Sequence, residues 1–281
     1  MSDYQKFEVT KPCLLRDFLE ERISNKALKS LKKDGDIRVN DVTRTVRYHL
    51  EIGDIVELYY PDESKKSQIL PWYFPLSVVY EDEYLMVVNK PKGMPSIPNR
   101  KYLKHTLANV LTAYYQMNHI PSMIHLVSRL DKDTSGLILV AKSRRMHQLL
   151  IDHFERRYLL AVEGVMCGEG TINAPIDKQE GSVIKRCVSM MGKHAITHYK
   201  VLKNNANDES LVEALLETGR THQIRVHFSH IGHPLLGDAL YGKAHPCYRG
   251  QALHSYYLEF VHPIKNEKMV FTHYPSWYEV F

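Results

Sequence analysis

Residues 127–142 read VSRLDKDTSGLILVAK, a charged loop that runs without interruption into an apolar segment. The apolar run at 137–141 follows a Thr-Ser-Gly turn and consists of strand-forming and aliphatic residues, which predicts a buried strand. Asp131 would then lie in a loop at the edge of a rigid sheet, where a scaffold can hold a reactive side chain in place. The alternative is a structural acid that pairs with Arg129 or Lys132 in a charged turn.

Strand and helix patterns are mixed on both sides of this segment. Strands are predicted at SVVY (77–80), YLMVVNK (84–90), GLILVAK (136–142) and YLLAVEG (158–164). Helices are predicted at 105–117 and at 143–157, the second with Ser143 as its N-cap. Because the elements do not alternate regularly, we expect an α+β fold with a mixed, largely antiparallel sheet.

Composition bounds the class of protein. The 281 residues, 44% of them hydrophobic, are enough for one large domain and a small companion. The 37 Lys and Arg outnumber the 32 Asp and Glu, and the net charge of +5 is compatible with a polyanionic partner but falls short of a nucleic-acid packaging protein. The four cysteines are scattered without a C-x-x-C pattern, so neither a disulfide framework nor a thiolate zinc site is predicted.

Targeting signals are not recognised in the sequence. The first ten residues, MSDYQKFEVT, contain no apolar signal region, and no apolar run approaches the roughly 18 residues of a membrane span. We therefore expect a cytoplasmic protein with no membrane partner.

A small basic module is predicted at residues 10–60. Helices are expected at LLRDFLEER (14–22) and at SNKALKSLKKDG (24–35), the second with Ser24 as N-cap and Gly35 as its end. DIRVND (36–41) and GDIVELYY (53–60) predict strands, which makes this a small α/β unit. A linker rich in proline, charge and serine is predicted at 61–75, and a second domain at 76–281.

Positive charge is concentrated in the small module. Between residues 22 and 47 there are eight Lys or Arg residues and only three acidic residues. Lys26, Lys29 and Lys33 would share one face of the second helix, the kind of stripe that binds phosphates. The alternative is a solvated lysine face with no partner.

A second motif, LETGRTHQIRVHFSHIGHPLLGDALYG, occupies residues 216–242. Thr221 is the expected N-cap of a helix, and Ile224, Phe228 and Ile231 mark its apolar face. Arg225 lies in the first turn and points off that face, so it is free to meet a carboxylate from elsewhere in the fold.

Two hydrolytic alternatives use other side chains. His222, His227, His230 and His233 suggest a metal site, but they do not form an H-E-x-x-H pattern and no cysteine is near, so no metal is expected. A two-carboxylate hydrolase would pair Asp131 with Asp133. Two residues so close in sequence rarely point at the same substrate atom.

Five ordered segments resemble the RluA-type family of pseudouridine synthases. The order and rough spacing of the five agree with the family over residues 76 to about 280. They are VVYEDEYLMVVNKPKGM, SRLDKDTSGLILVAK, RRYLLAVEG, TGRTHQIRVHFSHIGHPLLGDALYG and ALHSYYLEFVHP. In the small module, SNKALKSLKKDGDIRVN followed by GDIVEL resembles the αL RNA-binding domain of ribosomal small-subunit protein four.

The resemblance implies a role for five residues. Asp131 matches the catalytic aspartate, Tyr158 the active-site tyrosine and Arg225 the basic partner of the aspartate. Arg129 matches the arginine that helps to flip the target base, and Leu253 the apolar residue that packs at the base. The chain departs from the family where Ser128 replaces a common histidine and Arg156 a common lysine, which puts the subgroup and substrate in doubt rather than the reaction.

The resemblance therefore implies an RNA pseudouridine synthase that needs no cofactor and works as a monomer. Its expected substrate is structured RNA, with large-subunit ribosomal RNA favoured. Transfer RNA is the alternative substrate, and a non-catalytic RNA-binding or ribosome-assembly protein is the alternative function.

Overall fold

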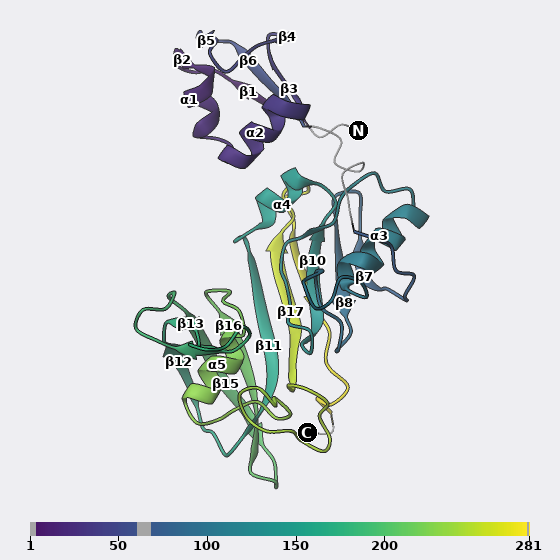
Figure 1. The fold of residues 1–281 in the computed structure, drawn as a ribbon, viewed down its shortest axis with the longest axis vertical. Coiled ribbons are helices and arrows are strands. Elements are labelled where there is room, and N and C mark those ends of the chain that lie inside the picture. Colours follow the sequence, from purple (N-terminus) through teal and green to yellow (C-terminus); the bar gives the residue numbers. More distant parts are fainter. Residues whose placement is uncertain (1–3, 61–68, 280) are drawn as a thin grey trace. The chain divides into compact units, whose positions relative to one another are not determined.

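The structure is a computed structural model that describes residues 4–60, 69–279 and 281 (Figure 1). The chain divides into two compact units, residues 1–67 and 68–281. Each unit has a hydrophobic core of its own.

The small unit combines two helices with short antiparallel strands. Its elements are β1 Tyr4–Glu8, β2 Cys13–Leu14, α1 Leu15–Glu20, α2 Asn25–Asp34, β3 Asp36–Val39, β4 Val42–Thr43, β5 His49–Leu50 and β6 Ile55–Tyr59. Four of the strands form a sheet in the order β1-β6-β3-β4, and β2 pairs with β5. The helices bury Leu15, Leu19 and Leu31 against this sheet. Because β1 pairs with β6 along its whole length, the unit begins before the predicted residue 10.

Helix α2 begins and ends where the sequence predicts. The Ser24 hydroxyl accepts a hydrogen bond from the Ala27 backbone N–H at 3.2 Å, which satisfies one of the free donors of the first turn. Gly35 follows the last helical residue and donates its N–H to the Leu31 carbonyl.

The predicted linker is shorter in the structure. Residues 61–68 lie outside the described part of the chain. Beyond them, the Trp72 N–H donates to the Asn109 carbonyl at 3.0 Å, and the Asn109 side chain donates to the Leu70 carbonyl at 2.7 Å. Residues 70–72 are therefore attached to the large unit rather than free of it.

The large unit is built around one sheet. Its elements are β7 Ser77–Glu81, β8 Leu85–Lys90, α3 Leu107–Met117, β9 His125–Leu126, β10 Ser135–Ala141, α4 Arg144–Leu150, β11 Phe154–Glu163, β12 Glu169–Asn173, β13 Ile176–Lys178, β14 Arg186–Val188, β15 Ile196–Asn204, β16 Glu209–Leu216, α5 Gln223–His230, β17 Leu253–Val261 and β18 Lys268–Thr272.

The sheet is mixed and largely antiparallel, as predicted. Its main path runs β12-β15-β16-β11-β17-β10-β8-β7, with β9 and β18 attached at β10 and β17. Among the pairs in the described residues, only β10 and β17 are parallel. Figure 1 shows β11, β17 and β10 side by side in the middle of the unit, so segments far apart in sequence meet there.

Two local predictions are wrong. The helix predicted at 143–157 ends at Leu150, and β11 begins at Phe154 because it pairs with β16 on one side and β17 on the other. The N-cap of α5 is His222 rather than Thr221. The Gln223 side chain instead accepts the Arg220 N–H at 2.9 Å, which holds the loop before the helix, and the N-cap itself makes no side-chain capping bond.

Gly136, the second residue of β10, explains why a glycine follows Thr134 and Ser135 in the sequence. Its φ is +111°, and a Cβ placed there would lie 2.3 Å from the Ser255 carbonyl oxygen. The parallel pairing of β10 with β17 at this residue therefore requires a residue without a side chain.

We expect Gly136→Ala to lower the free energy of unfolding by about 3 kcal/mol, because it adds backbone strain and forces β17 away from β10. Urea unfolding measures the change. The matched control is Gly181→Ala, which has φ +72° but no atom within 4 Å of the added Cβ. Equal losses in the two variants would contradict the close-approach explanation.

Candidate active site

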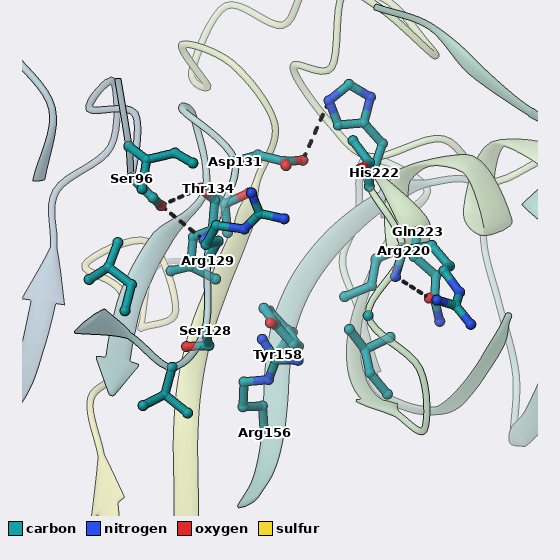
Figure 2. A pocket seen from close by; sticks show the side chains of 18 of the residues that line it. Ser96, Ser128, Arg129, Asp131, Thr134, Arg156, Tyr158, Arg220, His222 and Gln223 are labelled. Carbon is teal, nitrogen blue, oxygen red and sulfur yellow. Dashed lines mark hydrogen bonds and ion pairs between the residues drawn. The ribbon is translucent and has the colours of Figure 1, made fainter. Parts of the chain in front are cut away.

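A cavity of about 780 Å³ opens beside the loop that precedes β10 (Figure 2). Its walls come from this loop, from β11, from the start of α5 and from the first residue of β17. Figure 2 shows Arg129 and Asp131 on one side of the opening, with Arg220, His222 and Gln223 on the other.

The loop that carries Asp131 is fixed by hydrogen bonds to its backbone groups, two of them from the Ser96 side chain. The Ser96 hydroxyl donates to the Leu130 carbonyl at 2.6 Å and accepts the Leu130 N–H at 3.0 Å. The Thr134 N–H donates to the Asp131 carbonyl at 3.2 Å and closes a turn. These bonds hold the Asp131 side chain, which is 28% exposed, at the wall of the cavity.

The Lys90 side chain also holds this loop in place. Its ammonium group is buried and donates to the carbonyls of Pro91, Met94 and Lys132 at 2.9, 2.7 and 3.1 Å. Burial lowers the pKa of Lys90 to about 7, and the charges of Asp133 and Asp131 oppose this shift. Three carbonyl acceptors match the three N–H groups of an ammonium, so the geometry favours the protonated form.

Arg225 joins Asp131 to a second carboxylate. Its Nε and Nη2 donate to the two oxygens of Asp238 at 2.6 and 2.8 Å, a two-bond pairing that fixes the guanidinium plane. Its Nη1 donates to Oδ2 of Asp131 at 3.3 Å. The expected meeting of Arg225 with a carboxylate is present in the structure, and Asp238 is the additional acid that holds the arginine in place.

Arg225 remains positively charged although its side chain is buried. Burial by itself lowers the pKa of the guanidinium, but the hydrogen bonds and charge of Asp238 outweigh it, and the pKa is raised overall. A fixed cation therefore faces the carboxylate of Asp131.

His222 is a neighbour of Asp131 that was considered only as a metal ligand. Its Nε2 lies 3.8 Å from Oδ2 of Asp131 (Figure 2), and its Nδ1 lies 2.8 Å from the Tyr241 hydroxyl. Burial lowers the pKa of His222 below its usual range, although the charge of Asp131 opposes the shift. The ring is therefore neutral at neutral pH.

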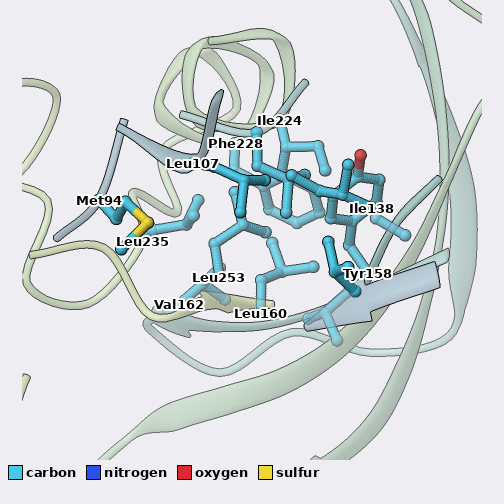
Figure 3. Packing of buried hydrophobic residues seen from close by; sticks show 14 of the residues in the cluster. Met94, Leu107, Ile138, Tyr158, Leu160, Val162, Ile224, Phe228, Leu235 and Leu253 are labelled. Carbon is cyan, nitrogen blue, oxygen red and sulfur yellow. The ribbon is translucent and has the colours of Figure 1, made fainter. Parts of the chain in front are cut away.

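Tyr158 belongs both to the core and to the cavity. It is 4% exposed and packs in the cluster that contains Leu160, Ile224 and Leu253 (Figure 3), yet it also lines the cavity. Burial raises the pKa of its hydroxyl, so the phenol stays protonated at neutral pH. The ring of Tyr158 is therefore both a member of the hydrophobic core and part of the cavity wall.

The remaining predicted site residues fall into two groups. Arg129 is exposed and Leu253 is buried, and both line the cavity. Lys29 and Lys33 are exposed on α2 of the small unit, whereas the side chain of Lys26 lies outside the described part of the structure. The structure therefore brings together Asp131, Tyr158 and Arg225 with Arg129 and Leu253, and leaves the lysines in the other unit.

The histidines of the second motif do not converge on one point. His227 bonds to the Thr197 hydroxyl and the Ala174 carbonyl, and His233 bonds to the Glu163 carbonyl. Within residues 4–60 and 69–279, no group of three or more His, Cys, Asp or Glu side chains is placed to hold a metal ion.

None of the helices described is both long and apolar enough to cross a membrane.

Comparison with known proteins assigns the chain to a family. Residues 84–230, just over half of the chain, match the profile of the family described as RNA pseudouridylate synthase. The chain therefore belongs to the RNA pseudouridylate synthase family, and it is an RNA-modifying isomerase. This confirms the predicted enzyme class and the resemblance found for the large unit.

Relatives and solved structures agree with this assignment. An uncharacterized RNA pseudouridine synthase of Bacillus subtilis, YjbO, is 43% identical over 89% of this chain and 90% of its own length. The ribosomal large subunit pseudouridine synthase D of Vibrio cholerae is 35% identical over 92% of this chain and 84% of its own. The solved structure of human RNA Pseudouridylate Synthase Domain Containing 1 aligns with a TM-score of 0.60 at 25% identity, over 73% of this chain and 86% of that one.

Proposed function

We propose that the protein converts uridine to pseudouridine with Asp131 as its reacting carboxylate. The proposal rests on the different surroundings of the two carboxylate oxygens of Asp131. Arg225 holds one oxygen of Asp131 at 3.3 Å, and the other, Oδ1, has no hydrogen bond to any residue that the structure describes. A carboxylate with one oxygen fixed and one free at the wall of a cavity can act on a sugar carbon.

The reaction needs no outside atom. The C1′–N1 bond of uridine breaks, the uracil turns while it stays bound, and a C1′–C5 bond forms. The proton lost from C5 balances the proton gained at N1, so the product is an isomer. The free oxygen of Asp131 would face C1′ both if it attacks this carbon and if it assists departure of the base.

Tyr158 and Arg129 have complementary tasks in this proposal. A base inside an RNA helix must be extruded before it can react, at a cost of a few kcal/mol. Arg129, exposed at the rim, would fill the vacated stack, while the ring of Tyr158 would contact the uracil. The hydroxyl of Tyr158 can relay the C5 proton, because its oxygen can accept this proton while its own hydrogen passes on toward N1 of the turned base. Leu253 would pack against the base from β17.

We infer that the substrate is large-subunit ribosomal RNA. Several relatives, including the Vibrio cholerae protein, bear the name ribosomal large subunit pseudouridine synthase D. The small unit supports an RNA-binding role, since its sequence resembles the αL domain and Lys29 and Lys33 are exposed on α2. Transfer RNA is the alternative that the experiment below separates.

The deciding experiment is pseudouridine mapping of total RNA at single-nucleotide resolution. Three strains are compared: wild type, a deletion, and the deletion with an Asp131→Asn copy. Sites that are lost in the deletion and stay lost with the Asp131→Asn copy identify the RNA and support the carboxylate together. If the Asp131→Asn copy restores every site, or the deletion loses none, the proposal fails.

Reversing the charge of Lys26, Lys29 and Lys33 to glutamate should weaken RNA binding and flatten its salt dependence. Each lost phosphate contact lowers the slope of log K against log salt by about 0.7 to 0.9. The measurement is a titration of RNA affinity at several salt concentrations. The triple arginine variant, which keeps the charge, serves as the control. Unchanged affinity in the glutamate variant would remove the small unit from RNA recognition.

A further inference from the structure

A second polar contact reaches Asp131 from the start of α5. His222 Nε2 and Arg225 Nη1 both approach Oδ2 of Asp131, at 3.8 and 3.3 Å. The longer distance exceeds that of a direct hydrogen bond. Catalytic hydrogen bonds are often long in a free enzyme and shorten when substrate fills the site.

The backbone of His222 is held in an unusual conformation. Its φ is +59° and its ψ is +18°, in the left-handed region that non-glycine residues rarely adopt. The residue occupies the N-cap position of α5, but its side chain makes no capping hydrogen bond. The left-handed backbone of His222 therefore coincides with a side chain that lines the cavity and does not cap the helix.

The partners of the ring indicate which nitrogen carries the proton. The Tyr241 hydroxyl oxygen accepts the Arg186 backbone N–H at 2.8 Å, and it lies 2.8 Å from Nδ1 of His222. If Nδ1 carried the proton, the Tyr241 hydroxyl would receive two donors and its own hydrogen would have no acceptor among the described residues. The arrangement is satisfied when Tyr241 donates to Nδ1, which leaves the proton on Nε2, toward Asp131.

We propose that His222 is a positioning residue for Asp131. Its Nε2–H and Arg225 Nη1 together hold one carboxylate oxygen, so that the other oxygen faces the ribose. This inference rests on the proposed role of Asp131 as the reacting group. Tyr241 takes part indirectly, because its hydroxyl selects the tautomer of His222.

An uncharged hydrogen-bond donor is suited to positioning the Asp131 carboxylate. The charged groups near the ring are Asp131, Arg225, Asp238 and Arg186, and burial keeps the imidazole uncharged among them. A second cation beside Asp131 would stabilise the carboxylate further and reduce its reactivity. A neutral N–H orients the oxygen without adding that charge.

The first test compares His222→Leu with His222→Gln. Neither leucine nor glutamine is among the residues that favour a left-handed backbone, and only glutamine keeps an N–H donor. We expect His222→Leu to lower kcat by about 10- to 100-fold with KM within about twofold of wild type. His222→Gln should recover most of this loss, while the two variants keep the same melting temperature.

The second test uses the Tyr241 hydroxyl. Tyr241→Phe keeps the ring and should lower kcat several-fold in the wild-type background, but not in the His222→Leu background, because it acts through the histidine. Nitrogen-15 NMR of histidine-labelled protein should show a protonated Nε2 in wild type. The same spectrum should show a mixture of tautomers in Tyr241→Phe.

The outcomes separate this inference from the proposed function. Equal kcat values for His222→Leu and His222→Gln, a loss confined to KM, or a proton on Nδ1 would overturn the role of His222. If Asp131→Asn is inactive while His222→Leu is fully active, only this inference fails. If Asp131→Asn is active, the proposed function fails first.

Discussion

Asp131→Asn should abolish pseudouridine formation and leave the protein folded. The substitution removes the charge that we propose acts on the sugar, and loss of a reacting group typically costs on the order of 10⁴-fold or more in kcat. Arg225 keeps both of its bonds to Asp238, so we expect the free energy of unfolding to change by less than about 1 kcal/mol.

Release of tritium from C5-labelled uridine in the target RNA measures the rate, since the C5 hydrogen leaves during isomerisation. The matched control is Asp208→Asn, an exposed aspartate in the turn between β15 and β16. Its φ is +55°, which asparagine also adopts readily. Activity of Asp131→Asn comparable with that of Asp208→Asn would rule out Asp131 as the reacting group.

Asp238→Asn should be the most destabilising single change of charge in the site. It leaves the buried Arg225 without its two-bond partner, and breaking a buried ion pair costs about 3–5 kcal/mol. Arg225 would also be drawn toward Asp131, its remaining acid, which would reduce kcat. Thermal unfolding and the tritium assay measure the two effects.

The double variant Arg225→Met with Asp238→Asn separates stability from activity, because the asparagine oxygen can still accept the N–H groups of Leu240 and Tyr241. Removing both charges should restore much of the lost stability, because no unpaired charge remains in the interior. Activity should stay low, since Asp131 has then lost the cation that orients it. An Asp238→Asn protein as stable as Asp208→Asn would show that the buried pair contributes little.

The sequence was sufficient for elements that depend on local patterns. Helix α2 is bounded by Ser24 and Gly35 because a hydroxyl cap and a helix-ending glycine act within a few residues. The strand after the Thr-Ser-Gly turn was predicted from its apolar run and is present as β10. The convergence of Arg225 on Asp131 was predicted from the free face of a helix and from the family resemblance.

Features that depend on long-range contacts were missed. Asp238 carries no local signal of its own, because its partner Arg225 lies on a helix that must first fold back against it. Lys90 precedes a proline and carries no local sign that its ammonium group is buried, because its third carbonyl partner comes from the distant loop that contains Lys132. The start of β11 was assigned to a helix because its two neighbouring strands, rather than its own residues, determine its conformation.

The position of β17 has a consequence for synthesis on the ribosome. This strand comes late in the chain but lies between β10 and β11, so it joins two groups of strands made earlier. The group that contains β10 is joined to the loop that bears Asp131. The group that contains β11 carries Tyr158, and its strand β16 is followed by the helix that carries Arg225. Until Leu253 and the residues after it have emerged, the two halves of the proposed catalytic centre have no strand to connect them. A nascent chain can therefore complete the proposed catalytic centre only after β17 has been made.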